Sequence, residues 1–117
     1  MDKKNLVSII IPYQKKKNFF SSTINSIYKQ TFKNYEVILV YDDIDRKEAN
    51  FVKNQLKKIK NKKVIFNKKI LGPGLSRNIG IKYAKGEFVS FCDADDTWHK
   101  NKLSDQIKFM KKNSLSF

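Results

Sequence analysis

The sequence has 117 residues, enough for one domain with a hydrophobic core. It carries 25 lysines and arginines against 11 acids, a formal net charge of +14, and it contains no apolar run long enough to span a bilayer. The single cysteine, Cys92, excludes an internal disulfide and fits a reducing compartment. We therefore expect a cytoplasmic protein, free to sit peripherally at the inner face of the membrane, with Cys92 as a buried side chain.

The positive charge is almost entirely lysine, because Arg46 and Arg77 are the two arginines. Proteins that read nucleic acid favour arginine for its bidentate contacts, and here the lysines are scattered over every segment. Nucleic-acid binding is therefore disfavoured. The charge still leaves one alternative function open, a basic non-enzymatic module that binds nucleic acid or an anionic membrane surface with an affinity that falls steeply as salt rises.

Apolar runs rich in valine and isoleucine alternate with segments whose apolar residues recur at helical spacing. Strands are expected at residues 6–12, 35–41, 64–66 and 87–92. Helices are expected at residues 21–30, 48–60, 75–84 and 101–113, the first capped by Ser21 or Ser22. This alternation predicts a single α/β domain with a mostly parallel, Rossmann-like sheet and helices on both of its faces.

In such sheets, ligands bind beyond the carboxyl ends of the strands, near the point where the strand order reverses. The first strand is followed by Tyr13-Gln14-Lys15 and not by a glycine-rich phosphate loop. A dinucleotide-binding Rossmann domain and a P-loop NTPase are therefore both disfavoured.

Acidic residues follow the fourth predicted strand directly. Asp93 and Asp95 are two positions apart, so that in an extended segment both carboxylates point to the same side. Hard oxygen ligands suit Mg²⁺ or Mn²⁺, and zinc is disfavoured because no histidine or thiol cluster accompanies them. The competing interpretation is that these aspartates form a turn or cap the next helix.

Two further stretches at predicted strand ends are candidates for ligand contacts. Asp42 and Asp43 end the second strand, where an acid commonly binds a ribose hydroxyl or a base N–H, although an ordinary turn explains them equally well. The glycine-rich loop at residues 72–78 opens a helix whose free N–H groups can meet an anion, and it carries Arg77. Trp98 is expected to pack beneath the acidic loop.

Four separated motifs resemble glycosyltransferase family 2, the inverting enzymes of the GT-A fold. They lie at residues 7–13, 30–40, 75–88 and 93–98. The resemblance implies a nucleotide-diphosphate-sugar donor, such as a UDP-sugar, whose base is framed by Pro12 and Tyr13. It places Asp42 or Asp43 on the base or ribose and Arg77 beside the nucleotide. The family usually has Asp-Asp-Gly-Ser where this chain has residues 41–45, Tyr-Asp-Asp-Ile-Asp, so the choice between Asp42 and Asp43 stays open.

The resemblance also implies the metal's ligands and its purpose. Asp95 would bind Mg²⁺ or Mn²⁺ on the donor diphosphate, and Asp93 would approach both the ribose and the metal. The metal would neutralise charge that builds on the leaving diphosphate. A nucleotidyltransferase with a similar sheet and metal is a third hypothesis, ranked low because such enzymes lack the Arg77-Asn78 helix signature.

Family catalytic domains continue well past the Asp-x-Asp motif. The resemblance therefore implies that residues 1–117 form one nucleotide-sugar-binding domain, incomplete relative to the family's catalytic domain and inactive alone. The general base is expected beyond residue 117, and the acceptor would be a glycan or lipid-linked saccharide in cell-surface polysaccharide or glycolipid synthesis. A surface bared by truncation is expected to self-associate.

Overall fold

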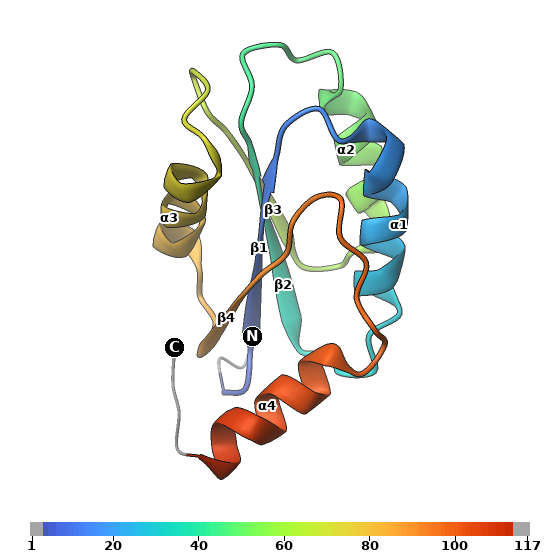
Figure 1. Ribbon diagram of the computed structural model, residues 1–117, viewed down its shortest axis with the longest axis vertical. Helices are drawn as coiled ribbons and strands as arrows, with labels where there is room; N and C mark the ends of the chain where they lie inside the picture. The colour runs from blue at the N-terminus through green and yellow to red at the C-terminus, as the bar shows by residue number, and fades with distance from the viewer. Residues whose placement is uncertain (1–3, 114–117) are drawn as a thin grey trace.

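The computed structural model of the chain describes residues 4–113, and its strands and helices alternate as expected. Figure 1 shows the elements in chain order: β1 (Val7–Tyr13), α1 (Lys17–Tyr28), β2 (Tyr35–Tyr41), α2 (Ala49–Gln55), the 3-10 turn η1 (Leu56–Lys58), β3 (Lys62–Phe66), α3 (Pro73–Tyr83), β4 (Phe88–Phe91) and α4 (Lys102–Lys112). No helix within residues 4–113 is both long and apolar enough to cross a lipid bilayer.

The four strands form one parallel sheet in the order β3-β2-β1-β4. In the register, Ile10 of β1 is opposite Ile38 of β2 on one side and Phe91 of β4 on the other. The chain thus adds β2 and β3 to one side of β1 and then returns to place β4 on the other side. The strand order reverses at β1, so the carboxyl ends of β1 and β4 mark the place where α/β sheets bind ligands.

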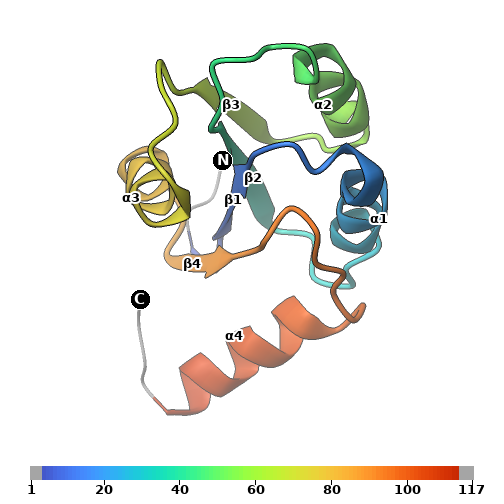
Figure 2. The same cartoon turned by 45° about the horizontal axis from the view of Figure 1, so that its top comes forward.

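Helices cover both faces of the sheet, which confirms the predicted α/β class. Figure 2 shows α3 on one face and α1 with α2 on the other. Successive residues of β1 point to opposite faces, so Ile10 packs under α3 while Ile9 and Ile11 pack toward α1. All three are 0% exposed. Burial on both faces is the physical reason for the continuous apolar run in this strand.

Helix α1 begins earlier than its sequence indicates. Ser21 and Ser22 were expected to cap it, but they lie inside the helix, and the backbone oxygen of Lys16 accepts the first helical N–H bonds, from Phe19 and Phe20. The ring of Phe20 is fully buried and lies 5.0 Å from that of Tyr13, edge to face. Packing of this ring against the end of β1 therefore determines where the helix starts.

The other helix boundaries also differ from the predictions. Helix α3 starts at Pro73, where the proline lacks the N–H that a first helical residue would leave unbonded. Gly72 precedes it with φ of 89°, a left-handed conformation that other residues rarely adopt. Helix α2 ends at Gln55, and the expected helix continues only as the 3-10 turn η1.

A buried hydrogen-bond cluster ties the turn between α3 and β4 to the first two strands. The Glu36 carboxylate, 5% exposed, accepts bonds from the Ser8 hydroxyl at 2.5 Å and the Lys85 N–H at 2.7 Å. The Gly86 N–H donates in turn to the Ser8 hydroxyl at 2.8 Å. The chain at Gly86 lies so close to β1 that a Cβ there would be 2.6 Å from the Leu6 carbonyl oxygen.

We predict that Gly86→Ala lowers the free energy of unfolding by about 1–3 kcal/mol, because the added methyl group must push strand β1 or the turn aside. Urea unfolding followed by circular dichroism measures the change. Gly74→Ala is the matched control, since a Cβ at Gly74 meets nothing within 4 Å. Equal losses in the two variants would contradict the prediction.

Candidate functional site

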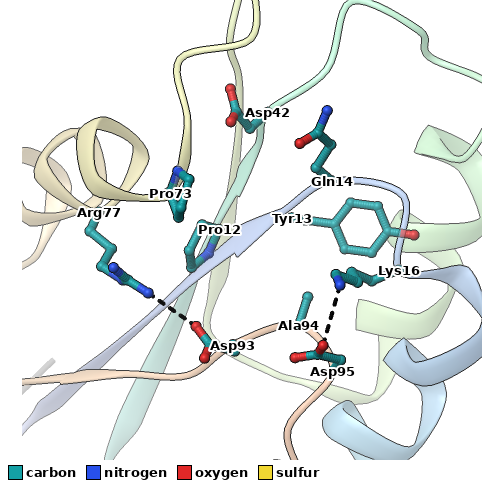
Figure 3. A pocket seen from close by; sticks show the side chains of 10 residues that line it. All are labelled: Pro12, Tyr13, Gln14, Lys16, Asp42, Pro73, Arg77, Asp93, Ala94 and Asp95. Atoms are coloured by element: carbon teal, nitrogen blue, oxygen red, sulfur yellow. Dashed lines mark hydrogen bonds and ion pairs between the residues drawn. The ribbon is translucent and has the colours of Figure 1, made fainter.

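A pocket of about 340 Å³ opens at the carboxyl ends of β1 and β4, where the strand order reverses. Figure 3 shows its lining side chains: Pro12, Tyr13, Gln14, Lys16, Asp42, Pro73, Arg77, Asp93, Ala94 and Asp95. Six of the seven residues singled out from the sequence are among them. The seventh, Asp43, does not line the pocket.

The acidic loop after β4 is a turn and not the extended segment that was expected. The Asp96 N–H donates to the Asp93 carbonyl oxygen at 3.0 Å, which closes the turn. Both Asp93 and Asp95 nevertheless border the same pocket. The buried Ala94 between them, 3% exposed, anchors the turn against the core.

Each of the two aspartates is paired with a cation from across the pocket. An Asp93 carboxylate oxygen lies 3.1 Å from Nη2 of Arg77, and an Asp95 carboxylate oxygen lies 3.3 Å from Nζ of Lys16 (Figure 3). The Arg77 Nε is buried and has no hydrogen-bond partner among the described residues. What Arg77 presents to the pocket is the positive charge of its partly exposed guanidinium group, as an anion-binding residue requires.

Polar side chains of α1 hold the acidic loop in place. The Thr23 hydroxyl donates to the Ala94 carbonyl oxygen at 2.9 Å, and the Ser26 hydroxyl accepts from the Trp98 N–H at 3.0 Å. Trp98 is 7% exposed and belongs to the main hydrophobic cluster, which confirms its predicted packing role. Helix α1 thus holds a loop that has little regular structure of its own.

Gln30, just past the end of α1, makes the most extensive of these contacts. Its side-chain nitrogen donates to the His99 carbonyl oxygen at 2.7 Å and to Ser26 O at 3.2 Å. Its side-chain oxygen accepts from the Leu103 N–H at 3.1 Å, at the start of α4. Gln30 is 0% exposed, and its bond with the Leu103 N–H is buried.

Asp42 is the member of the acidic pair that faces the pocket. It is 2% exposed, and its Oδ1 accepts bonds from the Asn67 side chain at 2.9 Å and from the Leu71 N–H at 2.8 Å. Its Oδ2 accepts from the Gly72 N–H at 2.9 Å. Asp42 thereby fixes the loop between β3 and α3. Asp43 instead accepts the Asp45 N–H at 3.1 Å, as in an ordinary aspartate turn.

Tyr13 borders the pocket from inside the core. Its ring is 1% exposed and stacks on Tyr41 with centroids 5.6 Å apart. Its hydroxyl donates to the Glu48 carboxylate. Burial, reinforced by that hydrogen bond and by the charge of Glu48, raises the pKa of Tyr13 well above its usual range, so the phenol stays neutral. It therefore acts as a packed wall of the site and not as an acid or base.

Cys92, directly before the acidic loop, is 1% exposed, which confirms the expected buried side chain. Burial, with the negative charges of Asp96 and Asp93 adding to it, raises the pKa of the thiol to about 12. The thiol is thus neutral at physiological pH and unsuited to nucleophilic chemistry.

The pocket's donor set fits a divalent ion only in part. Within residues 4–113, no cluster of three or more histidine, cysteine or acidic side chains could hold a metal by itself. Asp93 and Asp95 supply two carboxylates at one pocket. Mg²⁺ and Mn²⁺ commonly bind through one or two carboxylates, while substrate phosphates and water complete the shell. The residues therefore fit an ion that binds together with a phosphate ligand.

Sequence reasoning missed four pocket residues, namely Gln14, Lys16, Pro73 and Ala94. Lys16 is the consequential omission, because it contacts Asp95. In the sequence it is the middle residue of a run of three lysines and carries no distinguishing signal. Lys16 faces the pocket because the backbone turns at Lys15, where φ is 50°, just before α1 begins.

Comparisons with known proteins agree with this geometry. The model of the family described as "Glycosyl transferase family 2" matches residues 8–117. An uncharacterized glycosyltransferase of Rickettsia conorii is 37% identical over 113 residues, which is 95% of this chain and 18% of that protein. The Escherichia coli protein WfgD, a UDP-Glc:alpha-D-GlcNAc-diphosphoundecaprenol beta-1,3-glucosyltransferase, is 39% identical over 96% of this chain. This chain spans 44% of its length.

Solved structures of GT-A glycosyltransferases share the fold. Staphylococcus aureus TarS, residues 1–349 in complex with UDP, superposes with a TM-score of 0.81 at 34% identity, over 92% of this chain and 32% of that one. A mannosyltransferase from Pyrobaculum calidifontis, in complex with GDP-Man and Mn²⁺, has the same TM-score of 0.81 over 89% of this chain and 32% of that one. Its identity of 20% makes it a likeness of fold alone.

We predict that Gln30→Met destabilises the protein by about 1–3 kcal/mol, because it leaves the buried Leu103 N–H without its acceptor and removes one of the two hydrogen bonds to the His99 carbonyl. Amide hydrogen exchange should speed up at Leu103 and Trp98 before it does in the sheet. The control is Gln55→Met at the end of α2, far from the acidic loop. Unchanged exchange at Leu103 in the Gln30 variant would show that the loop is held by other contacts.

Proposed function

The chain belongs to glycosyl transferase family 2, and from this membership we propose that its pocket binds a nucleotide-diphosphate sugar through a divalent metal ion. The bound sugar would be passed to an acceptor with inversion. The observation that carries the proposal is the meeting of Asp93, Asp95 and Arg77 in one pocket at the strand-order reversal.

The proposed roles follow from the contacts of each side chain. Asp95, with Asp93 beside it, would hold Mg²⁺ or Mn²⁺, and the partly exposed guanidinium group of Arg77 would lie against the nucleotide. When bound, the ion supplies charge neutralisation on the leaving diphosphate. Pro12 and Tyr13 would frame the base as rigid apolar surface. We assign no general base and no acceptor contacts to these residues.

The hydrogen bonding of Asp42 supports a uridine nucleotide. A carboxylate offers about four lone-pair sites, and three hydrogen bonds from Asn67, Leu71 and Gly72 already occupy Asp42. One site on Oδ2 remains, enough for the single N–H of uracil but not for the two neighbouring donors of guanine. The UDP bound to the TarS relative points the same way. We therefore propose a UDP-sugar as the donor.

The relatives support a place in cell-surface polysaccharide or glycolipid synthesis. The E. coli relative WfgD is named for transfer to a sugar carried on diphosphoundecaprenol, a lipid-linked acceptor. We propose a lipid-linked saccharide or glycan as acceptor here, with the protein working from the cytoplasm at the inner face of the membrane. Because this chain spans less than half of that relative, the activity of the whole protein rests on this proposal.

We predict that UDP binds the purified protein only when Mg²⁺ or Mn²⁺ is present. Isothermal titration should detect binding with Mn²⁺ and none with a chelator. Asp95→Ala should weaken metal-dependent binding at least about tenfold, because the ion loses a direct ligand. Asp105→Ala, which removes an exposed acid in the first turn of α4, is the matched control and should bind as the wild type does.

Three outcomes of that titration would refute the proposal. Equal affinity for UDP with chelator and with Mn²⁺ would show that no metal ion takes part in binding. GDP binding as tightly as UDP would contradict the role given to Asp42. Affinity that is indifferent to Asp95 and falls steeply with salt would favour the basic non-enzymatic module instead.

We also propose that the protein self-associates through exposed apolar side chains near β4. The Phe91 side chain there is 38% exposed, and exposed apolar surface favours association with another chain. Sedimentation velocity should show a dimer that grows with concentration. Phe91→Lys should disrupt it, whereas Phe109→Lys on the exposed face of α4 should not. A monomer at every concentration would refute the proposal.

A further inference from the structure

Lys16 is held where it can reach the acidic loop. It is the residue before α1, and its backbone oxygen accepts N–H bonds from Phe20 at 2.9 Å and from Phe19 at 3.0 Å. Its ammonium group crosses the pocket to Asp95, with 3.3 Å between Nζ and Oδ2 (Figure 3). The backbone of Lys16 is therefore fixed, while its long side chain can turn toward another partner.

The Lys16–Asp95 pair is not what holds the loop together. Its two side chains are 42% and 43% exposed, and ion pairs this exposed contribute little to stability. The acidic loop is held instead by the buried bonds from Thr23 and Gln30. The ammonium group can thus leave Asp95 without loosening the loop.

A divalent ion that binds alone and one that binds together with a diphosphate face different electrostatic interactions at Asp95. A bare ion must displace the ammonium group of Lys16 and then remains close to its like charge. An ion that comes with a diphosphate brings anionic oxygens beside Asp95, and the displaced ammonium group gains a new partner. The second case is therefore favoured over the first.

We propose that Lys16 is an exchange cation, paired with Asp95 when the pocket is empty and with the donor's diphosphate when a divalent ion takes Asp95. This inference rests on the proposed function and adds to it a positioning residue and an order of binding. Because coupling between two ligands is reciprocal, the ion and the nucleotide must strengthen each other's binding by the same factor. Lys16 contributes to this coupling because it opposes the ion when the ion binds alone and attracts the diphosphate when both bind.

The test measures two affinities in wild type and in Lys16→Met. Free Mn²⁺, followed by electron paramagnetic resonance, gives the affinity for the ion alone, and calorimetry in saturating Mn²⁺ gives the affinity for UDP. In the variant, Mn²⁺ alone should bind about two- to fivefold tighter, the range that an exposed ion pair supports. UDP with Mn²⁺ should bind about tenfold weaker, as expected for loss of one charged hydrogen bond.

Lys15→Met is the matched control, because Lys15 is exposed, carries the same charge and does not line the pocket. It should leave both affinities close to wild type. Equal effects in the two variants would reduce Lys16 to general surface charge and overturn the proposal. Weaker binding of Mn²⁺ alone to Lys16→Met would overturn it too, as would a variant that no longer folds, since the pair is argued to carry little stability.

The outcomes also separate this inference from the proposed function. If wild-type protein binds no UDP with Mn²⁺, the proposed function fails first. If wild type binds it and Lys16→Met behaves identically in both titrations, the proposed function stands and only the exchange role of Lys16 is lost.

Discussion

The site depends on the hydrogen bonds that run from the side of α1 to the loop between β4 and α4. Residues 92–101 contain no helix or strand, yet they carry Asp93 and Asp95, two of the three carboxylates that line the pocket. Three polar side chains lie along one side of α1 and its end, because their spacing is three or four residues: Thr23, Ser26 and Gln30. Each forms a hydrogen bond with the backbone of that loop or with its junction to α4. The helix packs on the sheet through Phe20 and Ile24, so the geometry of the loop is fixed through the core.

The pocket brings acidic and basic side chains together in two ion pairs. The protein carries an excess of lysine, but its acids at the strand ends face two cations across a small opening. Carboxylates gathered without a ligand repel one another, and Arg77 and Lys16 relieve that repulsion. Under the proposed function, the same two cations would also be able to pair with the donor's diphosphate.

Much of this architecture could be predicted from the sequence. Strands such as β1 can be recognised in the sequence because burial on both faces requires an unbroken apolar run. The parallel arrangement of the strands follows from their alternation with helices. Helix starts were wrong where tertiary packing decides, as at Phe20, because a serine in the right place is only a local preference. Asp42 and Asp43 could not be told apart, since which one turns inward depends on the loop that returns from β3. Lys16 could not be distinguished from the neighbouring lysines in the sequence, because its position at the pocket depends on a single backbone turn.

The three hydrogen bonds to Asp42 have a consequence for the proposed nucleotide site. They order the loop from Asn67 to Gly72, and Pro73 restricts the backbone at its junction with α3. The conformational entropy of this loop is therefore lost when the protein folds and not when a ligand binds. A nucleotide of the proposed kind would therefore meet a surface that is already ordered at this wall of the pocket.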